Sequence, residues 1–316
     1  MSSLIEQAAH RLQQLRRAGA ATAEVRPAQR LPGGGHAAVA PEPDHLPATP
    51  AVESRRVDLD FDALAANGVL VPNTPRSLLR DQYRVVKRPL LRNAMGKGAS
   101  KLANGNLIMV TSALAGEGKT FTAVNLALSI ATELDHTVML VDADVARPTV
   151  AHLLGLAPSS EAPYGPGLLD VLDGSAEMSD ALLRTNIDKL TLLPSGTQHP
   201  RATEMLASDA MTRLLGEMGR RYPDRIIIFD SPPLLLTTEA RVLATHMGQV
   251  VVVVRAGETR QADVQSALAT IDLCPVRLML LNGAAAAADG GYGYGYGYAY
   301  DQRPSADTSL LDAPTA

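Results

Sequence analysis

Residues 107–131 read LIMVTSALAGEGKTFTAVNLALSIA, and this stretch decides the fold. Its first part, LIMVTS, is an apolar run with the length of a buried strand, and the part from residue 119 onward has a helical pattern. Between them, residues 113–120 match the phosphate-loop pattern G-x-x-x-x-G-K-[ST], with Ala113 in place of the first glycine. A strand, this loop and a helix in that order predict a nucleotide-binding α/β domain.

The loop predicts a set of contacts to a nucleotide phosphate. Glycine at 116 and 118 lets backbone N–H groups turn toward the phosphate, and the N-terminus of the next helix adds its positive dipole end. Lys119 is expected to reach the β- and γ-phosphates, and the Thr120 hydroxyl to bind Mg²⁺. The predicted nucleotide-binding residues are Ala115, Gly116, Glu117, Gly118, Lys119, Thr120 and Phe121.

Two more apolar runs end in carboxylates. TVMLVDADVARP, residues 137–148, places Asp142 and Asp144 at the end of a strand, and RIIIFDSPP, residues 225–233, places Asp230 at the end of another. Ligands of open parallel sheets bind at the carboxyl ends of the strands. We therefore expect a Mg²⁺ site at Thr120, Asp142 and Asp230, and catalytic roles for Lys119, Asp142 and Asp144.

Short apolar runs alternate with helical stretches from residue 105 to 283, which predicts a mostly parallel sheet sandwiched by helices. The expected strands are 107–112, 137–142, 189–194, 225–230, 249–254 and 277–282. The expected helices are 119–134, 149–155, 167–173, 202–220, 238–246 and 260–272, after an earlier helix over 76–92 in which Pro89 is expected to cause a stop or a kink. The fold class is that of a P-loop NTPase.

Extensions are expected at both ends of this domain, which we place at 76–283. Residues 1–21 predict an amphipathic helix that either packs on its own domain or frays in solution, or else docks on a partner or membrane surface. Residues 22–75, rich in Pro, Ala and Gly in their first part, predict a disordered linker. Residues 284–316 predict a flexible tail.

Composition narrows the class of protein. The net charge of −4 gives no sign of a nucleic-acid binder. The single cysteine, Cys274, excludes an internal disulfide framework and predicts a buried structural thiol. No apolar run reaches the length of a membrane span and the N-terminus does not resemble a signal peptide, so we expect a cytoplasmic protein that meets the membrane through a partner or a surface helix.

The tail holds five of the eight tyrosines of the chain, in the sequence GYGYGYGYAYD. By itself this pattern is typical of a flexible spacer or interaction tail. In a chain that also has a nucleotide site, the pattern has a more specific interpretation: each tyrosine phenol enters an active site and is modified there. The predicted phosphoacceptors are Tyr292, Tyr294, Tyr296, Tyr298 and Tyr300.

Taken together, ALAGEGKT, DADVARP and IIIFDSPP resemble the motifs of bacterial tyrosine kinases of exopolysaccharide systems, and PSGTQHPRATEML and GLLDVLDG are similar to further segments of that family. The N-terminal segment and the tyrosine tail resemble more specifically the autokinases of exosortase-linked (PEP-CTERM) loci. The resemblance covers about residues 76–300.

This resemblance implies ATP- and Mg²⁺-dependent autophosphorylation of the tail, in trans between copies of a homo-oligomeric ring, and regulation of exopolysaccharide biosynthesis or export. It implies a separate membrane activator of the chain-length-determinant class and a tyrosine phosphatase as partners. The family's ring motif E-x-x-R-x-x-R stands here as Asp81, Arg84 and Lys87, and the arginine of its DADxRxP motif is replaced by Ala146, with Arg147 next to it.

Two other functions fit the phosphate loop. A partition-type ATPase would act as a localisation or assembly switch, but such ATPases carry a signature lysine where Leu114 stands here. A nucleotide-binding scaffold would use the tail only for interaction, and its tyrosines would never be phosphorylated.

Overall fold

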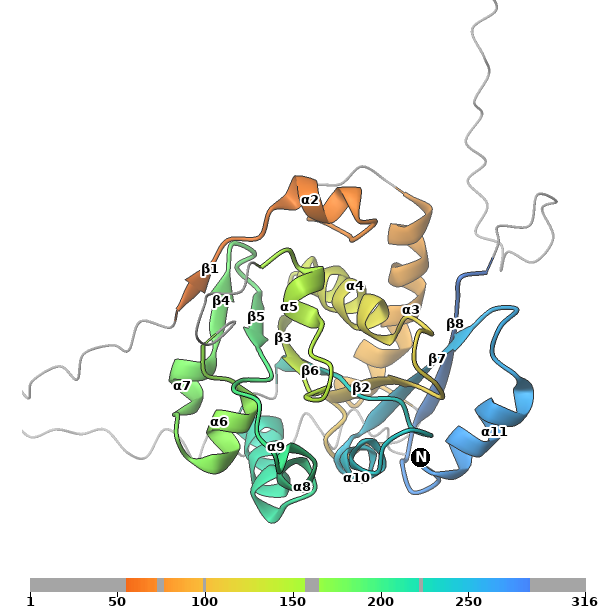
Figure 1. Ribbon diagram of the computed structural model, residues 1–316. Helices are drawn as coiled ribbons and strands as arrows, with labels where there is room; N and C mark the ends of the chain where they lie inside the picture. The colour runs from red at the N-terminus through yellow and green to blue at the C-terminus, as the bar shows by residue number, and fades with distance from the viewer. Residues whose placement is uncertain (1–54, 73–76, 99–100, 157–164, 222–223, 285–316) are drawn as a thin grey trace, which may run out of the picture. The chain divides into compact units, whose positions relative to one another are not determined.

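The computed structural model describes residues 55–72, 77–98, 101–156, 165–221 and 224–284. Within them, eight strands form one sheet with the order β1-β4-β5-β3-β6-β2-β7-β8 (Figure 1). All neighbouring strands are parallel except β4 and β5, which are antiparallel. The strands are β1 (Arg56–Val57), β2 (Leu107–Ser112), β3 (Thr137–Asp142), β4 (Leu183–Thr185), β5 (Leu190–Leu193), β6 (Arg225–Asp230), β7 (Gln249–Arg255) and β8 (Arg277–Asn282).

Helices cover both faces of this sheet, as the sequence predicts (Figure 1). One buried cluster joins the sheet to α2, α3, α4 and α5, and a second joins its other face to the helices from α6 to α11. The helices are α2 (Phe61–Ala66), α3 (Leu78–Ala94), α4 (Lys119–Ala131), α5 (Val150–Leu153), α6 (Leu168–Asp173), α7 (Met178–Ala181), α8 (Ala202–Leu206), α9 (Asp209–Arg221), α10 (Glu239–His246) and α11 (Gln261–Ala269).

The four central strands, β3, β6, β2 and β7, are almost completely buried, which explains why their sequences are continuous apolar runs rather than alternating ones. β2, β3, β6 and β8 have the predicted bounds, β5 is one residue shorter than predicted at each end, and β7 is one residue longer at its C-terminal end. The two short strands β1 and β4, at the far edge of the sheet, carry no such run and were not predicted.

The domain begins about twenty residues earlier than predicted. Residues 55–72 belong to it and are not part of the linker: β1 pairs with β4, and Leu59 and Leu64 are buried in the core. The Asp60 side chain caps α2 by accepting hydrogen bonds from two backbone N–H groups, and the Leu70 N–H donates to Asn125 Oδ1 at 2.8 Å. Composition does not mark this boundary, because the Pro- and Gly-rich residues run directly into a short apolar segment without strong periodicity.

Two helix predictions also need correction. The helix predicted over 202–220 is two helices, α8 and α9, because Ser208 lies between them and its hydroxyl accepts a hydrogen bond from the Met211 N–H. Of the stop or kink expected at Pro89, the stop does not occur, because α3 continues to Ala94. Proline removes only one helical hydrogen bond, and the next two residues, Leu90 and Leu91, are buried and hold the chain against the core.

The segments GLLDVLDG and PSG, far apart in the sequence, meet in the structure. Asp170 Oδ2 accepts hydrogen bonds from the backbone N–H of Gly167 at 2.8 Å and of Thr197 at 2.9 Å. A side chain at Gly167 would collide with the Pro194 carbonyl and with Gly196. Glycine is therefore required for the close approach that fixes the loop after β5.

Other predictions fall outside the described residues: the helix over 1–21, residues 22–54 of the linker and the tyrosine cluster. Among described residues, no helix is long and apolar enough to cross a membrane. Cys274 is buried with 3% of its surface exposed, as predicted, and burial raises the pKa of its thiol.

Candidate active site

The phosphate loop connects β2 to α4, with Gly118 as the last residue before the helix. Gly118 has φ 92°, and a side chain on it would collide with the Asn282 amide, so glycine is needed there for both reasons. α4 begins at Lys119, and its first backbone N–H groups have no carbonyl one turn earlier within the helix. Free amides at a helix N-terminus and the helix dipole favour an anion, so this geometry is suited to the phosphate contacts that the sequence predicts.

Lys119 points to the end of β3, where its Nζ lies 2.5 Å from Asp144 Oδ2. Burial acts to lower the pKa of this ammonium group, but the carboxylates of Asp230 and Asp144 outweigh it, so the pKa is raised. Lys119 is therefore a fixed positive charge that Asp144 holds at the mouth of the loop.

Thr120 joins the loop to β6. Its hydroxyl donates to Asp230 Oδ2 at 2.7 Å and lies 3.0 Å from the hydroxyl of Thr149, just before α5. Thr149 was missed by the sequence reasoning, because a lone threonine seven residues after a strand has no recognisable signal. The sequence-predicted residues Thr120 and Asp230 are thus brought together across 110 positions of the chain.

Asp142 and Asp230 lie side by side in neighbouring strands. Both are buried, at 2% and 0% exposure, and one oxygen of each, Oδ1, has no hydrogen-bond partner among the described residues. Burial raises the pKa of Asp230 to about 6 against the opposing effect of Lys119, and burial followed by the charge of Asp230 raises the pKa of Asp142 well above its usual range.

These unpartnered carboxylate oxygens beside a threonine hydroxyl fit a magnesium ion. Mg²⁺ prefers oxygen ligands and normally keeps several waters and phosphate oxygens, so it needs only one or two protein carboxylates. No cluster of three or more His, Cys, Asp or Glu side chains able to hold a metal occurs in the part of the chain that the structure describes.

Next to the loop lies a cavity of about 330 Å³. Lys119 and Asp144 form its polar side, and Pro232, Pro233 and Leu236, which follow β6, form an apolar wall. Among the predicted nucleotide-binding residues, Ala115 and Gly116 also line this cavity, whereas the Phe121 side chain packs against the core of the α4 layer. The cavity therefore combines a charged end with a surface suited to a flat apolar group.

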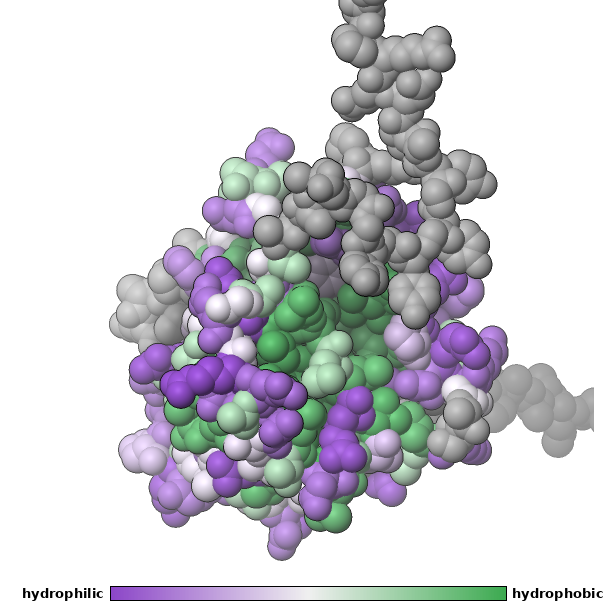
Figure 2. Space-filling view, turned by 90° about the vertical axis from the view of Figure 1, so that its right-hand side faces the viewer, coloured by the Kyte–Doolittle hydropathy of each residue, from purple (hydrophilic) through white to green (hydrophobic). Residues whose placement is uncertain are grey.

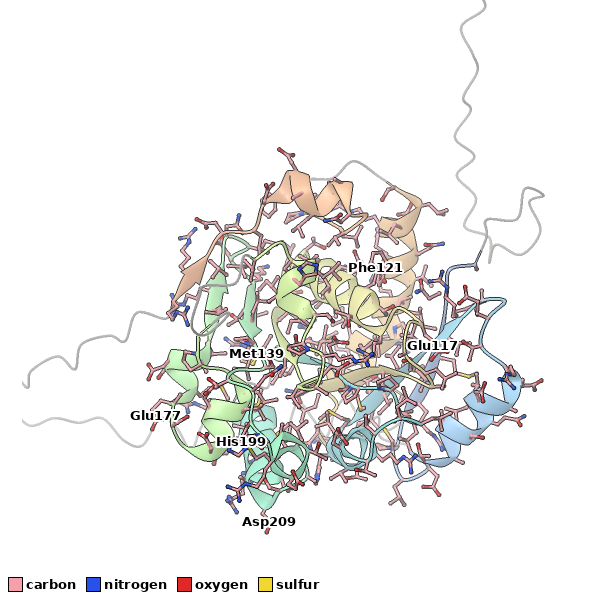
Figure 3. All side chains as sticks on the ribbon, in the orientation of Figure 1. Glu117, Phe121, Met139, Glu177, His199 and Asp209 are labelled. Atoms are coloured by element: carbon pink, nitrogen blue, oxygen red, sulfur yellow. The ribbon has the colours of Figure 1, made fainter. Side chains whose placement is uncertain are left out.

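The Glu117 side chain is buried, near β7 and β8 (Figure 3). Its carboxylate accepts hydrogen bonds from the Leu114 N–H at 2.6 Å and from the Thr259 hydroxyl, and its backbone carbonyl accepts one from Asn282 Nδ2 at 3.0 Å. We call Glu117, Thr259 and Asn282 the loop brace. Thr259 and Asn282 were not predicted, because only the folded chain brings them to the loop.

We predict that Glu117→Ala raises the KM for ATP about tenfold with a smaller change in kcat, because a lost hydrogen bond to a charged group is worth about 1.5–3 kcal/mol. Glu117→Gln, which can still accept from Leu114, should restore most of the affinity. Steady-state ATP turnover measures both parameters, and Glu258→Ala, an exposed glutamate one residue before Thr259, is the matched control. Lower stability with an unchanged KM would show that the brace serves folding alone.

With this geometry established, comparison with known proteins identifies the chain. A family profile described as AAA domain matches residues 105–279, more than half of the sequence. The tyrosine-protein kinase YwqD of Bacillus subtilis (strain 168) is 32% identical over 217 residues, which cover 68% of this chain and 85% of YwqD. The chain belongs to the bacterial tyrosine-protein kinase family.

Structural similarity agrees with this membership. The kinase domain of Escherichia coli tyrosine kinase ETK superposes with a TM-score of 0.55 at 25% identity, covering 74% of this chain and 97% of that one. The tyrosine-protein kinase wzc of Salmonella typhi is 29% identical over 170 residues, which make up 54% of this chain but only 22% of wzc. This tyrosine-kinase family member thus corresponds to a small part of wzc and to most of YwqD.

Proposed function

We propose that this chain is an ATP-dependent protein-tyrosine autokinase that phosphorylates Tyr292, Tyr294, Tyr296, Tyr298 and Tyr300 of a second copy. The observation that carries the proposal is the meeting of the loop residues Lys119 and Thr120 with Asp144 and Asp230, in a member of the tyrosine-kinase family. Tyrosines separated by glycines suit an acceptor that must enter another copy's site.

In the proposed reaction, the phenol oxygen of a tyrosine attacks the γ-phosphorus of ATP, the bond to the leaving ADP breaks, and the phenol proton passes to a carboxylate. Lys119 and the loop amides stabilise the negative charge of the transferring group. Asp142 and Asp144, the two predicted catalytic carboxylates, are the candidate proton acceptors, and Asp144 lines the cavity beside Lys119. Mg²⁺ held by Thr120, Asp142 and Asp230 would neutralise phosphate charge.

The cavity beside Lys119 is a suitable place for the acceptor ring. A phenol lying on Pro233 and Leu236 would direct its oxygen toward Lys119 and Asp144. Arg147, which also lines the cavity, is placed to supply the positive charge that Ala146 lacks.

The residue at position 114, a leucine, argues against a partition-type ATPase. The position of that family's signature lysine holds an apolar side chain packed against the core, and its N–H is bound by Glu117. A nucleotide-bound partner copy would meet no cation there. The kinase is therefore the better-supported function.

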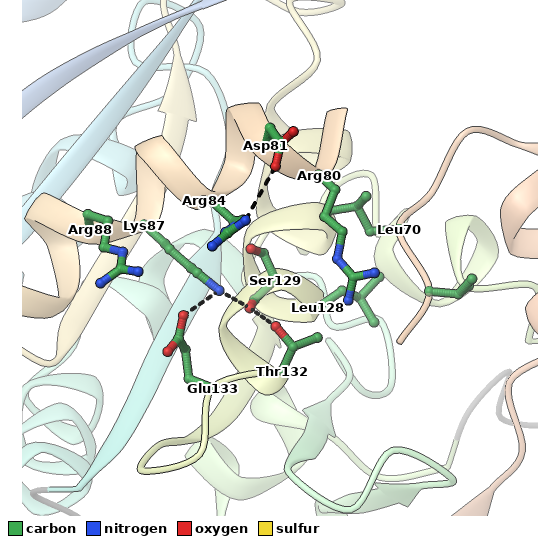
Figure 4. Close-up of a pocket in the computed structure, with 11 residues that line it drawn as sticks. Leu70, Arg80, Asp81, Arg84, Lys87, Arg88, Leu128, Ser129, Thr132 and Glu133 are labelled. Carbon is green, nitrogen blue, oxygen red and sulfur yellow. Dashed lines mark hydrogen bonds and ion pairs between the residues drawn. The ribbon is translucent and has the colours of Figure 1, made fainter. Parts of the chain in front are cut away.

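We further propose that Asp81 and Arg84 of α3 contact a neighbouring copy. Both are exposed, they pair with each other at 3.5 Å, and they line a cavity of about 400 Å³ between α3 and α4 (Figure 4). Lys87 was expected to share this role, but it is 3% exposed and bound within its own chain: its Nζ donates to Glu133 at 2.7 Å and to the Ser129 carbonyl at 2.6 Å. Lys87 instead binds a carbonyl near the C-terminus of α4, where a positive charge is favourable.

We predict that Arg84→Ala and Lys87→Met have different effects. Arg84→Ala should lower the molar mass measured by light scattering at micromolar concentration and leave stability unchanged, because the pair with Asp81 is exposed. Lys87→Met should lower the free energy of unfolding by about 2 kcal/mol, because buried charged hydrogen bonds are lost. If the Arg84→Ala variant and the unmodified chain have the same molar mass, the proposed contact between Arg84 and a neighbouring copy is contradicted.

The bond to Lys87 lowers the pKa of Glu133 despite partial burial. A carboxylate whose folded pKa is depressed stabilises the fold above its unfolded pKa, and this stabilisation is lost as the pH falls through the folded value. We therefore predict that the free energy of unfolding falls less between neutral pH and acid in the Lys87→Met variant than in the unmodified chain.

The remaining partners follow from the resemblance to exopolysaccharide kinases. We propose a membrane activator of the chain-length-determinant class, which would bring the kinase to the inner face of the membrane, and a phosphatase that resets the tail. The output would be control of exopolysaccharide biosynthesis or export. The net charge of −4 gives no support to a nucleic-acid partner.

The test is incubation of the purified chain with Mg²⁺ and ATP, with and without the cytoplasmic segment of a candidate activator, followed by mapping of phosphotyrosine by mass spectrometry. Phosphate on residues 292–300 supports the autokinase. ATP turnover with an unmodified tail, even with the activator segment, would favour the partition-type ATPase.

A further inference from the structure

β8 is the last strand of the sheet, and no described strand pairs with its outer edge. The carbonyls of Val276 and Asn282 accept hydrogen bonds from β7 and the residue after it, at 2.8 and 2.9 Å, so the even-numbered residues of β8 face β7. Because backbone groups alternate in direction along a strand, the N–H and C=O groups of Arg277, Met279 and Leu281 point outward. This edge can accept another strand.

One face of β8 is also unusually apolar for an exposed surface. Met279 and Leu281 are 66% and 63% exposed, whereas Val252, the β7 partner of Met279, is completely buried. The layer containing α11 therefore covers β7 but leaves β8 open. Figure 2, which looks onto the side where β8 and α11 lie, shows apolar side chains gathered in the middle of this face with hydrophilic ones around them.

The chain itself provides a segment that matches this edge. Only residues 283–291, GAAAAADGG, separate β8 from the tyrosine cluster 292–300. Two antiparallel strands can be joined by as few as two residues, and Asp-Gly pairs favour such turns, so nine residues are sufficient for the chain to reverse. The nine-residue cluster is longer than the six residues of β8.

The alternation of the cluster has the period of a strand. In an extended chain all five tyrosines would lie on one face and mostly glycines on the other. Tyrosine rings on the side of Met279 and Leu281 would cover the apolar surface, and glycines would lie toward the side of Leu278 and Leu280, which are already partly packed against the core.

We propose that the unphosphorylated segment 292–300 adds to the outer edge of β8 as an antiparallel strand, with its tyrosine rings on Met279 and Leu281. The strand gains main-chain hydrogen bonds from the edge and apolar contact from the patch. Phosphorylation opposes this docking, since each phosphotyrosine places about 1.5–2 negative charges on the apolar face. Release by phosphorylation rests on the proposed function, whereas the docking itself does not.

The test is residue-resolved hydrogen exchange by NMR on the full chain without nucleotide, so its result does not depend on kinase activity. The amides of Met279 and Leu281 should exchange about tenfold or more slowly than in a variant with all five tail tyrosines changed to serine. Changing them to phenylalanine, which keeps the rings, should preserve the slow exchange. Leu278 and Leu280, whose amides face β7, are internal references that should not change.

Substitutions on the docking surface complete the test. Met279→Glu with Leu281→Glu should make the amides of 292–300 exchange at the rate of an unstructured peptide, whereas Leu273→Glu, at a 79% exposed leucine outside β8, should not. Equal exchange of Met279 and Leu281 in the tyrosine and serine chains would overturn the proposal. A second result would also overturn it: slow exchange of the β8 amides that is lost on dilution, together with fast exchange of the tail amides. That result would mean that β8 pairs with β8 of a second copy.

Discussion

Replacing Lys119 by methionine is expected to lower the rate of tail phosphorylation about 10³-fold, the upper range for removing one group that stabilises a transition state. Methionine keeps the length of the side chain and removes only the ammonium group. Lys119 is the cation at the mouth of the phosphate loop, and its Nζ lies 2.5 Å from Asp144. Phosphotyrosine formed per minute with Mg²⁺ and ATP is the measurement.

Two further variants separate this chemistry from folding. Lys97→Met makes the same change at an exposed lysine and should leave the rate unaltered. Lys119→Arg keeps a positive charge beside Asp144, so it should fold as stably as the unmodified chain, but the planar guanidinium replaces a compact charge and should still slow transfer. A folded Lys119→Met chain that retains a tenth of the original rate would contradict the assigned role.

Changing all five tail tyrosines to phenylalanine is expected to abolish phosphate incorporation, with the nucleotide site intact. Full phosphorylation of the tyrosine tail adds about 8–10 negative charges in total, at about 1.5–2 per tyrosine. Each phosphoryl group also raises the mass of the chain by the same step, so intact-mass spectrometry distinguishes each state. Tyr83 should stay unmodified, because it is 5% exposed and burial raises the pKa of its phenol to about 12. Phosphate on Tyr83 in a folded sample would contradict this structure-based assignment.

A mixture tests whether transfer occurs between copies. An active chain with the phenylalanine tail is incubated with the Lys119→Met chain, which keeps all five tyrosines. Phosphate should appear on the Lys119→Met chain, because each copy supplies what the other lacks. An unmodified tail in this mixture, beside normal phosphorylation of the unaltered chain, would mean that each copy modifies only itself.

The residues of the candidate nucleotide site could be located in the sequence because they are adjacent in it or stand at the ends of strong apolar runs. ALAGEGKT is one local turn, and a carboxylate after a buried strand must lie at the carboxyl edge of a parallel sheet. For the same reason the bounds of β2, β3 and β6 agree with prediction to the residue. Local geometry and burial pattern suffice for such features.

The failures concern contacts between distant segments. Leu59 and Leu64 join the core through a short strand and helix with no strong periodicity, so a linker was predicted where the domain begins. Lys87 lies in a motif suggestive of a surface contact, yet its ammonium is bound inside the chain by Glu133. Neither outcome follows from the composition of the segment that contains the residue.

The sequence by itself determined the class of the sheet, the phosphate loop and the identity of its lysine, threonine and acidic partners, because each depends on neighbouring residues. Only the tertiary structure decided how the loop is held and where the sheet ends. Glu117 meets Thr259 and Asn282 across more than 140 positions, and among the described residues no strand pairs with the outer edge of β8. Such contacts arise from packing of separate elements, for which a single sequence carries no local signal.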